Sequence, residues 1–169
     1  IGGAAATQSA GGVAYYSALA YQRLGVPVAV LTKVAPADSQ WCLEELQASA
    51  IHTVVCPTPA TTRFENHYVE NARGARHQQA AAIAAPFAAD DLDGISGRCI
   101  HLGPLTAEDM PEPVVTAARL KFDWLVLDIQ GYLRTVQGTE VIATGGTGLT
   151  GILAAVDILK ASQSEAARM

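Results

Sequence analysis

Apolar positions along the chain follow two alternating periods. Residues 13–24 place Ala14, Ala18 and Tyr21 on one helical stripe, and the glycine and proline that follow end the predicted helix. Residues 28–31 then form a continuous apolar run, which predicts a strand buried on both faces of a sheet. The chain is therefore expected to alternate helices with strands.

The later elements repeat this order. Asp38 and Ser39 can cap a helix over residues 40–50. The remaining predicted elements are strands over 53–56, 99–102, 124–128 and 156–159, and a helix over 107–120 with prolines in its first turn. Strands that alternate with helices predict a parallel sheet with right-handed crossovers, and ligands of such sheets bind at the carboxyl ends of the strands.

One polar segment interrupts the alternation. In residues 61–79, the spacing of Phe64, Asn66 and Tyr68 and the turn-forming residues 71–74 predict a hairpin. The whole β-excursion, about residues 53–79, is expected to serve as a lid or a dimer contact. A solvated surface hairpin is the alternative. The rest of residues 1–169 is predicted to form a single α/β domain.

Composition narrows the classes of partner. The chain has 169 residues with 11 basic and 16 acidic side chains, a net charge of −5, so it offers no electrostatic footprint for nucleic acid. No apolar run approaches the roughly 20 residues of a membrane span. Cys42, Cys56 and Cys99 lie far apart and are predicted to be buried thiols in a reducing cytoplasm. A small molecule is therefore the expected partner.

A glycine pair is the first candidate for chemistry. Gly11 and Gly12 directly precede the first predicted helix, so a ligand could approach the amides of its first turn. A hydroxyl-rich or anionic ligand would suit such a site. Taken alone the pair is a weak signal, because glycine pairs before helices are often tight turns that bind no ligand.

Together with the residues that follow it, the glycine pair belongs to a segment that resembles a known protein family. Residues 11–38, GGVAYYSALAYQRLGVPVAVLTKVAPAD, resemble the amino-proximal signature of ribokinase-like, PfkB-type carbohydrate kinases, in which Gly-Gly opens a helix, Leu-Gly ends it, and a strand leads to Asp. Residues 62–76 resemble the lid strands, residues 125–134 (LVLDIQGYLR) the strand facing the sugar, and residues 156–166 the Asn-x-x-Glu segment. The resemblance implies a ribokinase-like parallel sheet sandwiched by helices, with a small β-lid, in an incomplete form.

The resemblance also implies a reaction and its residues. ATP, with Mg²⁺, would donate its γ-phosphoryl group to a hydroxyl of a sugar or similar small alcohol. Tyr16, Gln130 and Ser162 stand where the family commonly has Asn, and the aromatic Tyr16 favours a ring compound as acceptor. The implied roles are substrate binding by Gly11, Gly12, Tyr16, Asp128, Gln130 and Arg134, cofactor binding by Ser162 and Glu165, and a water-mediated Mg²⁺ contact by Glu165. A homodimer through the lid is a further expectation.

Two family features are expected outside this sequence. The first strand, with an Asp that binds the sugar, should precede Gly11, and the Gly-Ala-Gly-Asp motif with the catalytic base should follow Met169. The chain also begins at Ile1 rather than at an initiator methionine. We therefore expect an incomplete chain that holds no catalytic base and does not turn over alone.

Two other functions compete with the kinase. Gly146, Gly148 and Gly151 have GxGxxG spacing after an apolar stretch, which resembles the fingerprint of short-chain dehydrogenases and predicts an NAD(P)-binding Rossmann-type enzyme. Only 18 residues follow Gly151, whereas the acidic ribose ligand of that fold lies about 20 residues on. A non-catalytic sugar-binding or assembly module is the third possibility, because the base is absent.

Overall fold

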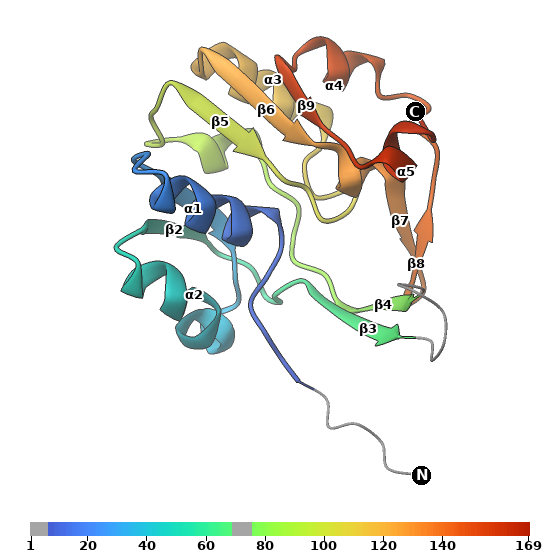
Figure 1. The fold of residues 1–169 in the computed structure, drawn as a ribbon, viewed down its shortest axis with the longest axis horizontal. Coiled ribbons are helices and arrows are strands. Elements are labelled where there is room, and N and C mark those ends of the chain that lie inside the picture. The colour runs from blue at the N-terminus through green and yellow to red at the C-terminus, as the bar shows by residue number, and fades with distance from the viewer. Residues whose placement is uncertain (1–6, 69–75) are drawn as a thin grey trace.

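The computed structural model describes residues 7–68 and 76–169, which form two parallel sheets with helices, together called the parallel layers below, and an antiparallel sheet at one side (Figure 1). One parallel sheet pairs β1 (Ala29–Lys33) with β2 (His52–Cys56). The other has the order β5-β6-β9. Its strands are β5 (Cys99–Leu102), β6 (Trp124–Asp128) and β9 (Ile158–Lys160).

The antiparallel sheet has the order β3-β4-β8-β7. It is called the lid sheet below because it contains the hairpin predicted as a lid, and that role stays a prediction. Two separate segments of the chain build it, and they meet where β4 pairs with β8. Its strands are β3 (Arg63–Tyr68), β4 (Arg76–Ala82), β7 (Arg134–Gln137) and β8 (Glu140–Ala143). Because β2 pairs with β1, the antiparallel part begins at Arg63 rather than near residue 53. The turn over residues 71–74 lies outside the described residues.

Helices and short 3₁₀ turns connect these strands. The helices are α1 (Val13–Arg23), α2 (Ser39–Ala48), α3 (Glu112–Lys121), α4 (Thr150–Ala154) and α5 (Gln163–Ala166). The 3₁₀ turns are η1 (Pro36–Asp38), η2 (Ala89–Leu92) and η3 (Ile129–Leu133). Among the described residues, no helix combines the length and the apolar character needed to cross a membrane.

Two hydrophobic clusters hold the parallel layers. The larger one buries Leu125, Leu127 and Ile129 completely, at 0% exposure, against the inner side of α3. The smaller one joins α1, β1 and α2 through Ala18, Val30, Leu43 and Leu46 and their neighbours. These clusters follow the apolar spacing of the sequence, because helices bury a stripe and strands bury alternate residues.

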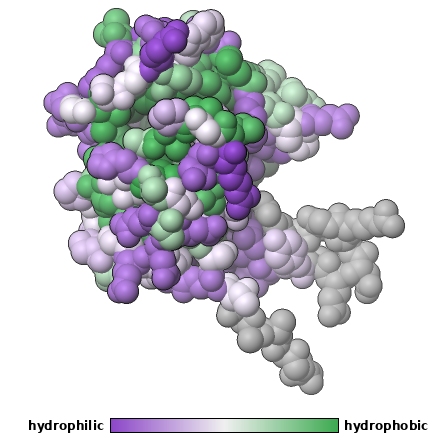
Figure 2. Space-filling model, turned by 60° about the vertical axis from the view of Figure 1, so that its left-hand side comes forward, coloured by the Kyte–Doolittle hydropathy of each residue, from purple (hydrophilic) through white to green (hydrophobic). Residues whose placement is uncertain are grey.

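The opposite face of the β5-β6-β9 sheet is less covered. Trp124 and Ile158 are each about half exposed, at 50% and 52%, and hydrophobic side chains gather in the upper part of the view in Figure 2. Cys99 pairs in register with Trp124 and is also exposed. The prediction of three buried thiols is therefore wrong for Cys99, while Cys56 is buried and Cys42 half-buried.

Several predicted elements are confirmed and others are shifted. The strands at 99–102 and 124–128 have the predicted bounds. The described residues form two parallel sheets, where a single parallel sheet was expected. Strand β1 was expected to be buried on both faces, but Val30 is its only buried residue. Helix α3 begins at Glu112, not at residue 107, because Pro111 precedes it and Asp109 holds the earlier residues in a turn.

Candidate functional site

The carboxyl ends of β5, β6 and β9 lie along one edge of their parallel sheet. The loop after β5, residues 103–106, runs along this edge and contacts the segments that carry the predicted site. A Cβ on Gly103 would lie 2.4 Å from Cβ of Val13, and a Cβ on Gly131 would lie 2.2 Å from the Pro104 carbonyl oxygen. Only glycine fits either contact, so α1, the loop and η3 pack closely together.

The glycine pair lies at the start of α1. Gly12 has φ 87° and precedes the first helical turn, and the ring of Tyr16 folds back to within 3.6 Å of the Cβ position of Gly11. Leu105 Cδ2 lies 3.4 Å from the corresponding position of Gly12. Tyr16 itself is 62% exposed, so its hydroxyl is open to a ligand. The structure thus places Gly12 against the loop after β5, and Gly11 against Tyr16.

Asp128 is the last residue of β6 and is buried, and Lys160 of the neighbouring strand β9 lies beside it. Its Oδ1 accepts a hydrogen bond from the Gln130 backbone N–H at 3.2 Å, and its Oδ2 forms an ion pair with Lys160 Nζ. The carboxylate therefore caps η3 and holds Gln130 at the sheet edge. Asp128 and Gln130, predicted together, lie together.

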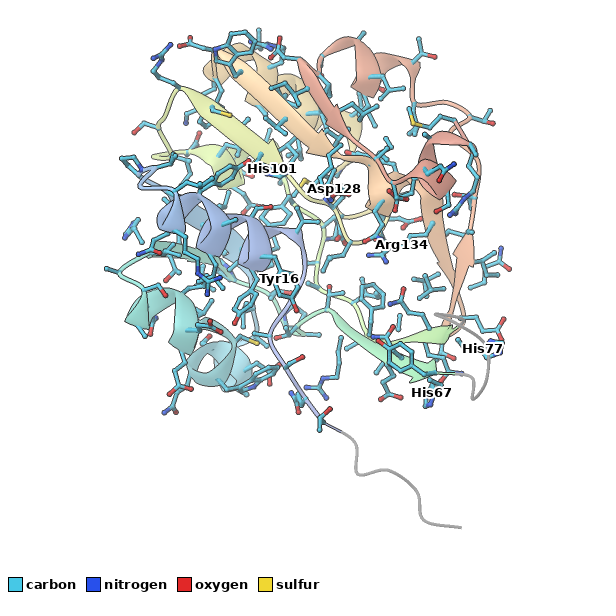
Figure 3. All side chains as sticks on the ribbon, in the orientation of Figure 1. Tyr16, His67, His77, His101, Asp128 and Arg134 are labelled. Carbon is cyan, nitrogen blue, oxygen red and sulfur yellow. The ribbon has the colours of Figure 1, made fainter. Side chains whose placement is uncertain are left out.

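Arg134 is the first residue of β7 and is buried, with 9% exposure. Its Nε donates to the Leu105 carbonyl oxygen and its Nη1 to Gln78 Oε1 at 3.2 Å. Its guanidinium lies over the ring of Phe64, 4.8 Å from the ring centroid. Figure 3 shows Arg134 between the parallel layers and the lid sheet, with His67 and His77 farther out on that sheet. The guanidinium is thus committed to protein groups.

Ser162 and Glu165 form a capping box at α5. Glu165 N–H donates to Ser162 Oγ at 3.3 Å, and Ser162 N–H donates to Glu165 Oε2 at 2.7 Å. Helix α5 contacts η3, so this pair lies near the Asp128 end of β6. Their role toward a nucleotide stays a prediction.

A magnesium ion would need oxygen ligands, and Glu165 supplies one carboxylate. No group of three or more His, Cys, Asp or Glu side chains is placed to hold a metal in the described part of the chain. Protein Mg²⁺ sites commonly use one or two carboxylates plus phosphates and waters, and Glu165 Oε2 already accepts the Ser162 N–H. A contact of Glu165 with Mg²⁺ through water stays a prediction.

His101 on β5 adds an electrostatic feature near this edge. Its Nδ1 lies 3.0 Å from the Tyr21 hydroxyl, and its buried Nε2 has no hydrogen-bond partner among the described residues. Burial lowers the pKa of His101, and Lys160 acts in the same direction, while Asp128 opposes them. A neutral imidazole is therefore favoured between α1 and the Asp128 end of β6.

The glycine-rich segment does not have the geometry of a dinucleotide-binding turn. The strand before it, β8, is antiparallel to its neighbours, whereas the fingerprint needs a parallel strand that leads into a helix. Gly146 N–H donates to the Arg168 carbonyl oxygen at 3.1 Å, and a Cβ on Gly151 would lie 2.2 Å from Glu112 Oε1. The NAD(P) interpretation therefore loses its structural basis.

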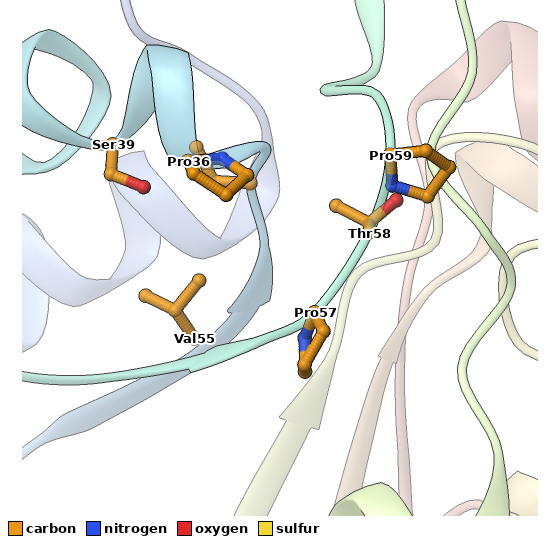
Figure 4. Close-up of a pocket in the computed structure, with 7 residues that line it drawn as sticks. Pro36, Ser39, Val55, Pro57, Thr58 and Pro59 are labelled. Carbon is orange, nitrogen blue, oxygen red and sulfur yellow. The ribbon is translucent and has the colours of Figure 1, made fainter.

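A separate pocket of about 480 Å³ lies at the carboxyl ends of β1 and β2 (Figure 4). Prolines and valines form most of its wall. Its two hydroxyls are occupied: Ser39 donates to the Ala35 carbonyl oxygen, and Thr58 donates to Ala60 and accepts from the Ala85 N–H. It contains none of the predicted site residues and is poorly suited to a hydroxyl-rich ligand.

Sequence reasoning missed the loop at residues 103–105. A signal was present, since Gly103 and Pro104 directly follow an apolar strand and so mark a turn at its carboxyl end. The contacts of this loop with Val13, Gly131 and Arg134 could be seen only in the structure, because these residues are distant from it in sequence.

Comparisons with known proteins agree with this architecture. The chain is similar to a pyrophosphate-dependent kinase of the ribokinase family in a sulfate complex, with TM-score 0.83 and 27% identity over 90% of this chain and 54% of that one. A structure of such a kinase with a pyrophosphate analog and myo-inositol gives TM-score 0.81 and 27% identity over 90% and 53%. A myo-inositol-1 kinase converted into a myo-inositol-3 kinase gives 0.79 and 26% over 90% and 51%.

No protein-family model and no curated protein matches the chain. The chain spans about half the length of the solved structures that it matches. The similarity nevertheless extends over nine tenths of this chain, and it agrees with the α/β fold of parallel sheets and helices that the resemblance in the sequence implied. The chain therefore has a ribokinase-like fold.

Proposed function

We propose that the protein transfers a phosphoryl group to a hydroxyl of a cyclic polyol. The observation that carries this proposal is the convergence of Gly12, the loop at 103–105 and Arg134 at one sheet edge beneath the lid sheet. Similarity to kinases whose names include myo-inositol supports a ring polyol rather than a linear sugar phosphate. Tyr16, aromatic and exposed at the glycine pair, suits such a ring.

The reaction is a displacement at phosphorus. An acceptor oxygen bonds to the terminal phosphorus of the donor, the bond from that phosphorus to the bridging oxygen breaks, and the acceptor hydroxyl releases its proton to a base. Gly11, Gly12 and Tyr16 bind and orient the acceptor, with Asp128 and Gln130 at the end of β6. We assign the general base to none of the described residues.

The donor is a polyphosphate. The resemblance in the sequence predicts ATP with Mg²⁺, whereas the similar kinases are named as pyrophosphate-dependent. Ser162 and Glu165, beside η3, are proposed to face the donor, with Glu165 reaching Mg²⁺ through water. Pairing of two copies through the lid sheet and a cytoplasmic location stay predictions.

Calorimetry and phosphorus NMR test the proposal together. The purified protein is titrated with myo-inositol, then incubated with myo-inositol and either ATP or pyrophosphate in the presence of Mg²⁺. We expect calorimetry to detect binding of the polyol. Phosphorus NMR should detect a phosphate monoester if the protein under test contains the general base. Stabilisation by NAD alone, without polyol binding, would retire the kinase in favour of the dinucleotide enzyme. Polyol binding without turnover by the complete protein would favour the non-catalytic module.

Two variants locate the acceptor site. Gly131→Ala places a methyl group against the Pro104 carbonyl, displaces the loop at 103–105, and is expected to weaken polyol binding by about tenfold or more. Gly97→Ala is the matched control, because its Cβ meets its neighbours only at 3.7 Å. Tyr16→Ala is expected to weaken binding without loss of folding. Unchanged affinity in both site variants would exclude this edge.

A further inference from the structure

Arg134 is buried and hydrogen-bonded to other parts of the protein, unlike an exposed arginine whose guanidinium is available to bind a phosphate. It is buried to 9% exposure, and burial of a guanidinium costs free energy unless its N–H groups are paired. Its partners include groups from three separate segments: the Leu105 carbonyl from the loop after β5, the Gln78 side chain from β4, and the Phe64 ring from β3. The first belongs to the parallel layers and the other two to the lid sheet.

The contacts on the lid side lie on one face. Phe64 pairs in register with Ala80, and Asn66 pairs with Gln78, so Phe64, Asn66 and Gln78 share the face that meets Arg134. Gln78 Nε2 also donates to Asn66 Oδ1 at 2.9 Å. The hydrogen-bonded chain therefore continues from Leu105 through Arg134 and Gln78 to Asn66, along the inner face of β3 and β4.

The contact on the core side is equally fixed. Leu105 N–H donates to Asp109 Oδ2 at 2.6 Å, and the Leu105 side chain touches the Gly12 position at 3.4 Å. Arg134 is therefore anchored to the same loop that packs against the glycine pair. Movement of its guanidinium would shift β3 and β4 relative to Gly12.

We propose that Arg134 is a positioning residue, which holds β3 and β4 at a set height over the acceptor by bridging the Leu105 carbonyl to Gln78 and Phe64. The proposal rests on the proposed polyol site. A planar guanidinium can donate in two fixed directions while it stacks on a ring, and a lysine ammonium cannot do all three. Arg134 thus acts through the lid sheet and not by contact with the transferred phosphoryl group.

Hydrogen exchange tests the bridge without any ligand. In Arg134→Lys and in Gln78→Ala, amides of β3 and β4 are expected to exchange about tenfold faster, while β5, β6 and α3 keep wild-type rates. Gln79→Ala is the matched control, because Gln79 is exposed on the opposite face of β4. The double variant should exchange no faster than Arg134→Lys alone, since both changes cut one bridge. Unchanged lid exchange, or faster exchange throughout the protein, would overturn the proposal.

Calorimetry with myo-inositol then tests the consequence. Arg134→Lys is expected to lower polyol affinity by about tenfold while β5, β6 and α3 keep their wild-type exchange rates, and Gln78→Ala should lower the affinity similarly. If the wild type binds no polyol, the proposed function is wrong. The hydrogen-exchange experiment still tests the Arg134 bridge in that case, because it uses no ligand. If Arg134→Lys loses affinity while lid exchange is unchanged, Arg134 contacts the ligand directly and the positioning role is wrong. Equal affinity despite a loosened lid would also contradict it.

Discussion

The β5-β6-β9 sheet and the lid sheet are held by different forces. In the parallel sheet, Leu125 and Leu127 are completely buried under α3. In the lid sheet, β3 exposes five of its six residues and only Phe64 is half-buried. What fastens the lid sheet is a set of polar contacts, among them Arg134 and the hydroxyls of the segment that leads into β3.

The difference has a consequence for motion. Opening the parallel sheet exposes a large apolar area, which costs roughly 25 cal/mol for each Å². Opening the lid sheet breaks a few hydrogen bonds that water can replace, each with a net contribution of about 1 kcal/mol. The lid sheet can therefore open locally while the parallel sheet stays closed, as a site that admits and releases a substrate requires.

The largest effect is expected in the parallel sheet. Leu127→Ala leaves a cavity where a side chain of 0% exposure was packed, and should lower the free energy of unfolding by about 2–5 kcal/mol. Urea denaturation followed by circular dichroism measures it. Leu120→Ala is the control, since Leu120 is 86% exposed, and should change stability by less than about 0.5 kcal/mol. Similar losses in both variants would mean that the core lies elsewhere.

An ion pair largely shielded from solvent joins β1 to η2, and its contribution to stability is expected to be intermediate. Lys33 Nζ lies 2.8 Å from Asp91 Oδ2, with side-chain exposures of 9% and 17%, and the ammonium also lies over the Phe87 ring at 5.2 Å. Asp91→Ala leaves the ammonium unpaired and should cost about 3 kcal/mol in the same denaturation experiment. Asp93→Ala, two residues along and exposed, should leave the curve unchanged. An unaffected Asp91→Ala would show the pair to be dispensable.

The sequence predicted the parallel layers better than the lid sheet, for a physical reason. Strands β5 and β6 are apolar runs whose bounds depend on local residues, and they were predicted to the residue. Strands β7 and β8 are short, and β8 pairs with a β4 some sixty residues earlier, so no local pattern marks them. Half of the lid sheet was therefore missed.

The site divides in the same way. Gly11 and Gly12 were recognisable because a glycine pair before a helix is a local signal, and Asp128 because it ends an apolar strand. The burial of Arg134 against Leu105, Gln78 and Phe64 depends on residues from three distant segments. The resemblance in the sequence therefore implied substrate binding by this arginine, and its contact with the lid sheet could not be detected from the sequence.

A smaller effect is expected at the base of the lid sheet. Thr62 Oγ1 accepts a hydrogen bond from the Ala84 N–H at 2.9 Å, which ties the two ends of the β3-β4 hairpin together. Thr62→Val keeps the shape but removes the acceptor, and should cost about 1 kcal/mol. Hydrogen exchange should show the loss in β3 and β4 and not in β6. Thr116→Val, on the exposed side of α3, is the control; equal exchange in the two variants would contradict this assignment.

The smallest effect concerns a polar contact within the parallel layers, and it depends on pH. Asp157 Oδ2 accepts from the Leu125 N–H at 2.7 Å and pairs with Arg119 of α3. The Leu125 N–H, and after it Arg119, lowers the pKa of Asp157 below its usual value. A carboxyl whose pKa is lower in the folded than in the unfolded state stabilises the fold above its unfolded pKa, about 3.9, and loses that contribution as the pH falls through its folded pKa.

Asp157→Asn should therefore be less stable than the wild type near pH 7, and the difference in stability should narrow below about pH 4. Arg119→Leu should keep part of the pH dependence, because the Leu125 N–H remains. Thermal melts of the three proteins between pH 2 and 7 decide the matter, and a gap of constant size at every pH would show that the Asp157 charge adds nothing to the packing of β6 against α3.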